Sequence, residues 1–169
     1  MEEETTLRGQ LAATVYAWQE NPPTRSEVLT CTETLMVWRT RTGADGLWEQ
    51  PPKMVTATID DAMGHGLDVI HRVAQMAGIE LHPLGLLVPA EKVIAACRRL
   101  TPAWLGMTIL QFDSEPIIAG IRAALPPSTR LIAGGPLFRA DPELAARCGI
   151  DTVLADAAAF AAYLLDQRL

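Results

Sequence analysis

The chain has 169 residues, of which 49% are hydrophobic and 20% are charged, so its composition is that of a globular protein and excludes a disordered or fibrous one. At this length it can bury one good core, with room for one domain and a small appendage. The formal net charge is −6 and no cluster of Lys or Arg offsets it. Because such a chain repels a phosphate backbone, we expect no nucleic-acid partner.

The cysteines and the N-terminal sequence indicate in which cellular compartment the protein is expected. Cys31, Cys97 and Cys148 are far apart and never in C-x-x-C spacing, which predicts neither a disulfide framework nor a thiolate metal site. The sequence starts with Met1-Glu2-Glu3-Glu4, which lacks the basic start and apolar run of a signal peptide. No apolar stretch reaches the roughly 20 residues needed to span a bilayer. We expect a cytoplasmic protein with reduced, mostly buried cysteines and no membrane contact.

Residues 5–40 carry two sets of apolar residues at helical spacing. Asn21-Pro22-Pro23 should stop the first helix, and Thr24 or Ser26 can cap the second. Residues 1–41 are therefore predicted to form a helical hairpin, and the glycines and prolines of 42–52 predict a linker. The two apolar sets are Leu7, Leu11, Val15 and Trp18, then Val28, Cys31, Leu35 and Trp38.

Short apolar runs then alternate with helical stretches through residues 53–169, which we interpret as one domain. Five βα units in succession predict an α/β fold with a parallel sheet. Right-handed crossovers favour a flavodoxin-like (Rossmann-like), doubly wound sheet with strand order 2-1-3-4-5. The expected strands are 54–59, 80–84, 104–110, 130–133 and 152–154, and the expected helices are 67–77, 89–100, 115–125, 142–148 and 157–165.

The binding crevice of such a sheet lies beyond the carboxyl ends of its strands, here between the first and third strands. A phosphorylation receiver would need an acceptor Asp after strand three and a Lys after strand five, where this chain has Thr108 and Asp156. A flavodoxin would bind its flavin phosphate with a hydroxyl-rich loop after strand one. That loop holds Asp60 and Asp61 instead, whose negative charges would repel a phosphate group.

The loop sequences match those of a third kind of protein that adopts this fold. Asp61-Ala62-Met63-Gly64-His65-Gly66 follows strand one, and Val88-Pro89-Ala90-Glu91-Lys92 starts the second helix. Gly106-Met107-Thr108-Ile109-Leu110 ends strand three, and Gly134-Gly135-Pro136 follows strand four. The stretch from Ala145 to Asp151, with Asp156-Ala157, matches the end of the same pattern. In order and spacing, the chain resembles the cobalamin (vitamin B12)-binding domain family, and within it the corrinoid methyl-carrier proteins.

The resemblance implies that cobalamin or a related corrinoid binds at these loops, with its nucleotide tail running into the sheet beside Thr108. It implies a carrier whose partner is a methyltransferase or another corrinoid-using protein, rather than a complete enzyme. No nucleophile–base pair for independent catalysis is evident, and no residue is predicted to be catalytic. The implied cofactor-binding residues are Asp61, Met63, Gly64, His65, Gly66, Thr108, Leu110, Gly134, Gly135, Pro136 and Asp156.

One position departs from the family. Its D-x-H-x-x-G motif supplies the lower cobalt ligand from the histidine, which the aspartate orients, but this chain has Met63 there. A thioether is a soft, weak ligand that a carboxylate cannot tune. His65, between two glycines, is an alternative cobalt ligand. Equally, Met63 could plug the crevice, and Asp61 could cap the following helix.

Two functions of different class remain open. The first is a corrinoid-binding carrier module serving a methyl-transfer system. The second, favoured by Met63, is a non-catalytic sensor or interaction module that binds cobalamin without histidine ligation, another tetrapyrrole, or no cofactor. The apolar surface of residues 5–40 also predicts a homodimer joined there, the competing arrangement being a hairpin folded over its own crevice.

Overall fold

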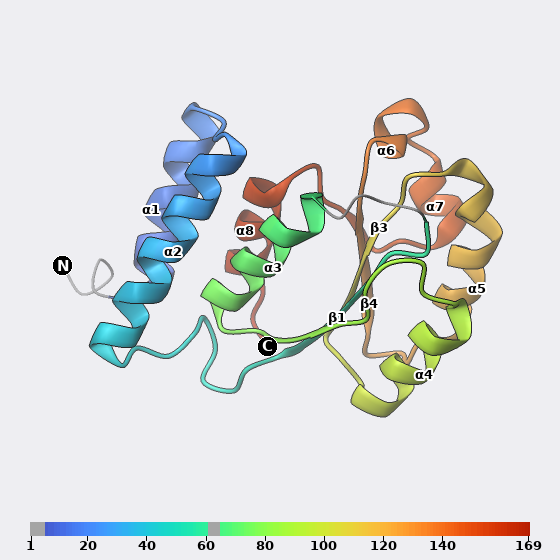
Figure 1. Ribbon diagram of the computed structural model, residues 1–169, viewed down its shortest axis with the longest axis horizontal. Coiled ribbons are helices and arrows are strands. Elements are labelled where there is room, and N and C mark those ends of the chain that lie inside the picture. The colour runs from blue at the N-terminus through green and yellow to red at the C-terminus, as the bar shows by residue number, and fades with distance from the viewer. Residues whose placement is uncertain (1–5, 61–64) are drawn as a thin grey trace. The chain divides into compact units, whose positions relative to one another are not determined.

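The computed structural model describes residues 6–60 and 65–169, with only the backbone of His65. Figure 1 shows the elements in chain order. Two helices come first, α1 (Leu7–Glu20) and α2 (Arg25–Thr42). They are followed by β1 (Lys53–Ala57), α3 (His65–Ala77), β2 (Glu80–Pro83), α4 (Ala90–Leu100), β3 (Trp104–Thr108), the 3-10 helix η2 (Phe112–Ser114), α5 (Glu115–Ala124), β4 (Arg130–Gly134), α6 (Leu137–Ala140), α7 (Leu144–Cys148), β5 (Thr152–Val153) and α8 (Ala157–Asp166).

The strands form one five-stranded sheet in the order β2-β1-β3-β4-β5. Parallel pairing joins β1 to β3, β3 to β4 and β4 to β5, with Met54 opposite Trp104 and Trp104 opposite Arg130. The predicted flavodoxin-like fold class, with its strand order and its two preceding helices, is confirmed. Trp104, at 1% exposure, lies in the core at the start of the third strand.

The chain divides into two compact units. The helical unit comprises Met1–Pro52, His65–Glu80 and Asp156–Leu169, and the sheet unit comprises Lys53–Gly64 and Leu81–Ala155. Each is described by itself below. The sequence-based limits of 1–41, 42–52 and 53–169 stay a prediction.

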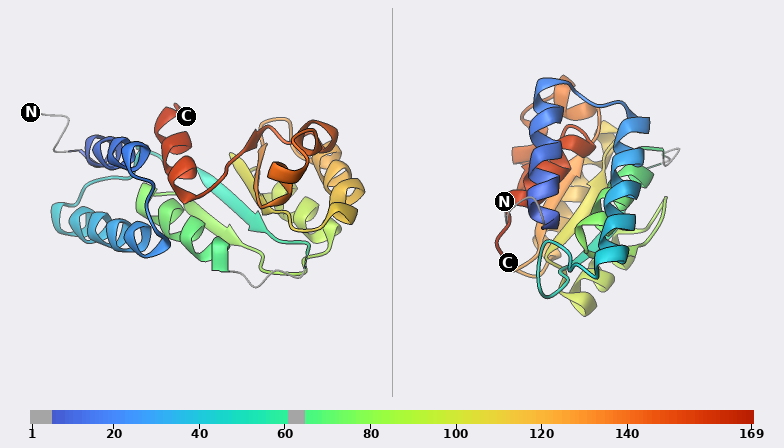
Figure 2. Two further views of the ribbon diagram at one scale, coloured as in Figure 1. Left: turned by 90° about the horizontal axis from the view of Figure 1, so that it is seen from above. Right: turned by 90° about the vertical axis from the view of Figure 1, so that its left-hand side faces the viewer.

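In the helical unit, α1 packs on α8, α8 on α3, and α3 on α2 (Figure 2). The Arg39 guanidinium of α2 donates to the carbonyls of Gln75 and Met76 in the last turn of α3, where a positive charge interacts favourably with the helix dipole. The segment after α2 lies against the same helix end, because the Leu47 N–H donates to the Ala77 carbonyl at 2.8 Å. The apolar residues buried in α1 and α2 are Leu7, Leu11, Val15, Val28 and Leu35.

Local signals explain the bounds of α2. Thr24 is its N-cap, and Glu27 bonds back to Thr24 in a capping box, so the first of the two predicted caps is the one in place. Gly43 ends the helix in the left-handed region at φ 66°. The helix ends at Thr42, one residue beyond the predicted hairpin limit of 41.

The core of the sheet unit lies on one face of the sheet. Alternate residues of the central strands point to it, as the period of two requires. Helices α4 and α5 cover it with Val93, Cys97, Ile118 and Ile121. The strand residues on this face are Val55, Ala57, Leu105, Met107, Leu131 and Ala133.

Two short elements were not expected from the sequence, η2 and α6. Helix α6 buries Leu137 and Phe138 against the core, so packing stabilises a turn too short to show periodicity. Helix α7 begins at Leu144, two residues later than predicted from Pro142. Among the described helices, none is long and apolar enough to cross a membrane.

Candidate functional site

The carboxyl ends of β3 and β4 bring together several of the predicted residues. Thr108 pairs with Gly134 in the parallel register. The Ile109 N–H donates to the Gly134 carbonyl at 2.9 Å, which extends the pairing one residue past the strands. The carboxyl ends of β3 and β4 thus hold Thr108, Leu110, Gly134 and Gly135, beside the position between β1 and β3 where the crevice is predicted.

Gly135 is required by the protein's own backbone. Its φ is +134°, and a β-carbon there would lie 2.2 Å from the Ile109 carbonyl oxygen. No L side chain fits such a contact without movement of the backbone. At Gly134 a β-carbon would lie 3.0 Å from the Leu154 carbonyl oxygen. This glycine pair therefore serves close approach of neighbouring strands, whether or not a ligand also lies near it.

A buried carboxylate joins two loops at this edge. Asp60, which is 5% exposed, follows β1 and accepts a 2.8 Å hydrogen bond from the Leu110 N–H through Oδ2. Its Oδ1 accepts from the hydroxyl of buried Ser114, at the end of η2. Both carboxylate oxygens are thus bonded. We call Asp60, Leu110 and Ser114 the Asp60 network; it fixes the loop after β3 to the chain that follows β1.

The face of the sheet opposite the core of the sheet unit carries small and hydroxyl-bearing residues near the same edge. Gly106 has no side chain there, and the Met54 methyl group would lie 2.5 Å from an added β-carbon. Thr58 is 1% exposed, and its Oγ1 has no hydrogen-bond partner in the described part of the chain. Burying a hydroxyl without a partner costs free energy, so Thr58 is an unusual residue for a purely structural position.

The loop after β2 is bonded to the same threonine. The Thr58 N–H donates to the Gly85 carbonyl, and its carbonyl accepts from the Val88 N–H, both at 3.1 Å. Pro89 then caps α4, so the motif from Val88 to Lys92 begins that helix as predicted. Residues 58–60 are therefore held in place by the hydrogen bonds of Thr58 to the loop after β2 and by the Asp60 network.

The other predicted residues fall elsewhere. Asp61, Met63 and Gly64, with the side chain of His65, lie outside the described residues. In the helical unit, Gly66 is in the first turn of α3 with open space around it, and Asp156 caps α8 by accepting from the Ala159 N–H at 2.8 Å. Pro136 is the exposed N-cap of α6 in the sheet unit. Whether these residues contact a cofactor stays a prediction.

The titratable side chains outside this edge are not arranged as a metal site. In residues 6–60 and 65–169, no three His, Cys, Asp or Glu side chains are grouped to hold a metal ion. His71 and His82 are partly exposed, and burial lowers the pKa of His71. Burial raises the pKa of the Cys97 thiol to about 11. All three cysteines are free thiols.

Most of the chain, including this site, matches a known family. The B12 binding domain pattern covers residues 54–164. The chain belongs to the B12-binding domain family. The predicted family and the predicted cofactor class, cobalamin or a related corrinoid, are thereby confirmed. No curated protein sequence matches the chain.

Solved structures show the same fold at low sequence identity. A cobalamin-binding protein from Desulfitobacterium hafniense is 16% identical with a TM-score of 0.73, over 92% of this chain and 76% of that one. The monomethylamine corrinoid protein of Methanosarcina barkeri is 17% identical with a TM-score of 0.58, over 68% and 57%. A chain of the methanol:cobalamin methyltransferase complex MtaBC from the same organism is 15% identical with a TM-score of 0.66, over 95% and 66%.

The residues of the sheet unit suit the family's cofactor. The Thr58 hydroxyl, which no described residue hydrogen-bonds, and the half-buried Thr108 hydroxyl can donate to amide, phosphate or ring-nitrogen acceptors of a corrinoid. Gly106 leaves its place on the sheet to the flexible end of Met54, which can move aside. Sequence reasoning had not selected Thr58, Asp60 or Ser114, although the acidic pair Asp60-Asp61 was a visible signal.

Proposed function

We propose that this chain is a corrinoid-binding carrier module that serves a methyl-transfer system. Cobalamin binds at the carboxyl edge of the sheet unit, and its nucleotide tail runs along the face that holds Thr58, Gly106 and Thr108. The observation that carries this proposal is the buried Thr58 hydroxyl, which has no hydrogen-bond partner among residues 6–60 and 65–169, on a sheet face kept small by Gly106. When bound, the corrinoid supplies a cobalt that can carry a methyl group.

The residues of the chain then have distinct roles. Thr58 and Thr108 bind the tail by hydrogen bonds, and the Asp60 network holds the loop after β3 in place beside it. Met63 stands at the family's ligand position, so the lower cobalt position is not held by a well-tuned histidine. His65 remains the candidate nitrogen ligand of this chain.

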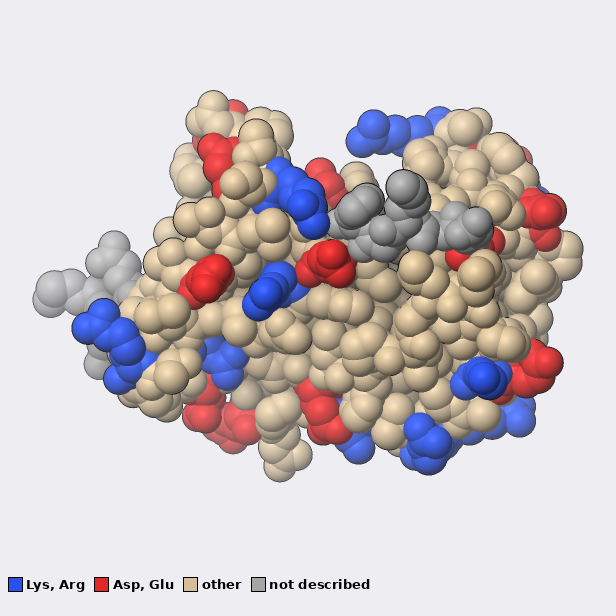
Figure 3. Space-filling view, viewed as in Figure 1, with Lys and Arg blue, Asp and Glu red and all other residues tan. Residues whose placement is uncertain are grey.

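The partner of such a carrier is a methyltransferase or another corrinoid-using protein. Support comes from the likeness in fold to the corrinoid protein and to the methyltransferase complex of Methanosarcina barkeri. On the face in Figure 3, the described basic and acidic side chains are interspersed rather than gathered into one basic patch. This agrees with a protein partner rather than nucleic acid.

A homodimer through residues 5–40 also remains a proposal. Most of the apolar residues on which it rested are buried within the helical unit, for example Leu11 at 0% and Leu35 at 5% exposure, whereas Trp18 and Trp38 are partly exposed. A contact between copies would have to use another face of these helices.

Two corrinoids test the binding mode. The chain is titrated with hydroxocobalamin and with cobinamide, which lacks the nucleotide tail, and binding is followed by the visible spectrum. If the tail binds beside Thr58, hydroxocobalamin should bind more tightly than cobinamide. The Thr58→Val substitution should then lower the affinity for hydroxocobalamin and leave the affinity for cobinamide unchanged. Equal affinity for the two corrinoids would overturn the tail placement.

The carrier role needs a separate readout. The bound corrinoid is reduced with titanium(III) citrate and offered iodomethane, and methylation is followed by the visible spectrum. A carrier should become methylated and retain the product through gel filtration. A chain that binds the corrinoid but shields it from methylation would favour the sensor alternative, which Met63 also favours.

A further inference from the structure

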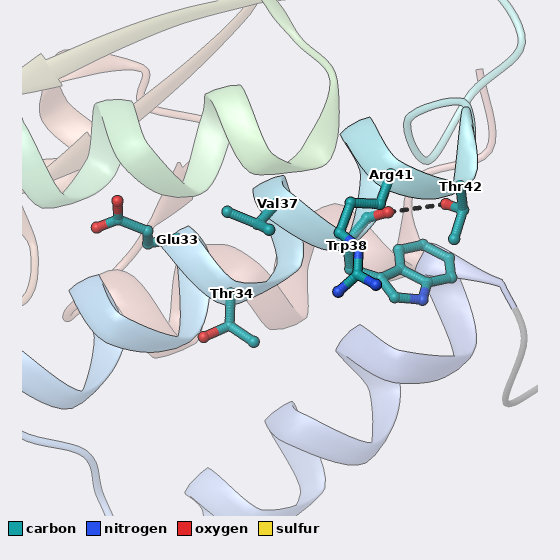
Figure 4. Close-up of a pocket in the computed structure, with 6 residues that line it drawn as sticks. All are labelled: Glu33, Thr34, Val37, Trp38, Arg41 and Thr42. Atoms are coloured by element: carbon teal, nitrogen blue, oxygen red, sulfur yellow. Dashed lines mark hydrogen bonds between the residues drawn. The ribbon is translucent and has the colours of Figure 1, made fainter.

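A groove runs along the outer face of α2. It has a volume of about 580 Å³. Two rows of side chains, each at intervals of four residues, form its walls. In Figure 4, Glu33 and Thr34 lie toward one end of the groove, and Trp38 and Arg41 toward the other. The lining residues are Glu33, Val37 and Arg41 in one row, and Thr34, Trp38 and Thr42 in the other.

One wall of the groove, the row with Val37 at its centre, faces away from the packed side of α2. Val28, Thr32 and Leu35 are the buried residues of this helix, and α2 packs on α3. At about 100° per residue, Val37 lies roughly opposite these residues around the helix axis. It is 52% exposed, and Trp38 beside it is partly exposed. An apolar centre is thus presented on the outside of the helical unit.

The groove carries two exposed charges of opposite sign, Glu33 and Arg41. Neither Glu33 nor Arg41 has an ion-pair partner in the part of the chain that the structure describes. They lie four residues before and four residues after Val37. A second α2 running antiparallel across Val37 would bring its Arg41 to Glu33, and its Glu33 to Arg41. The groove is therefore complementary in charge to a copy of itself.

We infer that this groove joins two copies of the chain in an antiparallel α2–α2 contact. Rows at intervals of four residues are the ridges that interdigitate when helices cross at about −50°, the commonest packing class. The Glu33–Val37–Arg41 row of each copy fits the groove beside the same row of the other. A two-fold axis near Val37 gives a closed dimer with two symmetric ion pairs.

Sedimentation equilibrium of the full chain, without corrinoid, tests the inference independently of the proposed function. A contact centred on one helix is small, so we expect a dissociation constant in the range of about 1–100 µM. Arg41→Glu and Glu33→Arg should each weaken the dimer about tenfold or more, because two attractions become repulsions. The double exchange Glu33→Arg with Arg41→Glu should restore it.

Arg99→Glu is the matched control. Arg99 is exposed in the last turn of α4, as Arg41 is in the last turn of α2, so both changes cost the same helix-dipole interaction. This variant should dimerise like the original chain. Circular dichroism of each variant establishes that it is folded.

A monomer at about 200 µM would overturn the inference, since that concentration exceeds the expected constant. So would a dimer unchanged by Arg41→Glu, which would point to another face. Single variants that dissociate without rescue by the double exchange would contradict the antiparallel register and favour a different protein, or the chain's own sheet unit, as the occupant of the groove.

Discussion

The carboxylate of Asp60 accepts a 2.8 Å hydrogen bond from the backbone N–H of Leu110, fifty residues further along the chain. Its other oxygen accepts from Ser114. Two loops that flank the switch point of the sheet are thus joined by one buried side chain.

Removing the Asp60 carboxylate should destabilise the two loops that it joins. Asp60→Ala leaves the Leu110 N–H and the Ser114 hydroxyl unpaired, and should lower the free energy of unfolding by about 2–4 kcal/mol. Asp60→Asn keeps one acceptor for Leu110 and can donate to the Ser114 oxygen, so it should recover most of the loss. Urea unfolding of both variants checks this. Equal losses in the two variants would contradict the network.

Thr58→Val separates a binding role from a structural one. Because its hydroxyl has no partner in the described residues, removing it should leave the unfolding free energy unchanged or raise it by up to about 1 kcal/mol. Hydroxocobalamin affinity should fall about fivefold or more, equivalent to about 1 kcal/mol.

Thr129→Val is the control for this substitution. Thr129 is also a buried threonine of the sheet unit, but its hydroxyl donates to the Pro102 carbonyl at 2.8 Å. Its loss should lower the unfolding free energy by about 1–2 kcal/mol and leave cobalamin affinity unchanged. A stability loss in Thr58→Val as large as this one would mean that the Thr58 hydroxyl is already satisfied.

Substitution of Gly135 should destabilise the fold before any effect on a ligand. Gly135→Ala sets a β-carbon against the Ile109 carbonyl oxygen in a backbone region that L residues avoid, at an expected cost of about 2–4 kcal/mol. Gly120→Ala, in α5 with open space around it, should be neutral or stabilise by up to about 1 kcal/mol. Thermal unfolding of the two variants measures both. A stable Gly135→Ala protein with normal unfolding would refute this account of the edge.

The Cys97 thiol should make the chain sensitive to alkali. Burial raises its pKa to about 11, so the folded state holds the proton more tightly than the unfolded state. This contribution is complete below pH 9 and disappears as the pH rises through about 11, a loss of about 1–3 kcal/mol. The difference in unfolding free energy between the original chain and Cys97→Ala should therefore shrink over that range. A difference independent of pH would show that Cys97 ionises equally in both states.

The sequence predicted the fold class because its signals are local. Apolar periodicity, the Thr24 cap and Gly149 at the end of α7 each act within a few residues, and together they indicate the order of elements. The short helix α6 escaped prediction because its stability comes from burial of Phe138 rather than from its own sequence.

The site was predicted less completely, for a physical reason. Motif spacing located Thr108 and Gly134, which pair at the carboxyl ends of β3 and β4. It could not show that Gly135 is constrained by Ile109, or that Asp60 reaches Leu110, since these contacts join distant parts of the chain. Met63 lies outside the described residues, so the departure from the family at the cobalt ligand stays a prediction from sequence.

The lower ligand can be identified by electron paramagnetic resonance of the cob(II)alamin form. With Met63 at the ligand position, we expect no nitrogen splitting from a protein histidine. A nitrogen signal that disappears in His65→Ala would instead identify His65 as the ligand and contradict this expectation.

The most direct test of the central claim is reconstitution of the purified chain with hydroxocobalamin, followed by gel filtration and a visible spectrum of the protein peak. The account predicts a corrinoid spectrum that elutes with the protein at about one cofactor per chain, and that is diminished in Thr58→Val. A folded protein that elutes without any corrinoid after incubation with excess hydroxocobalamin would contradict it.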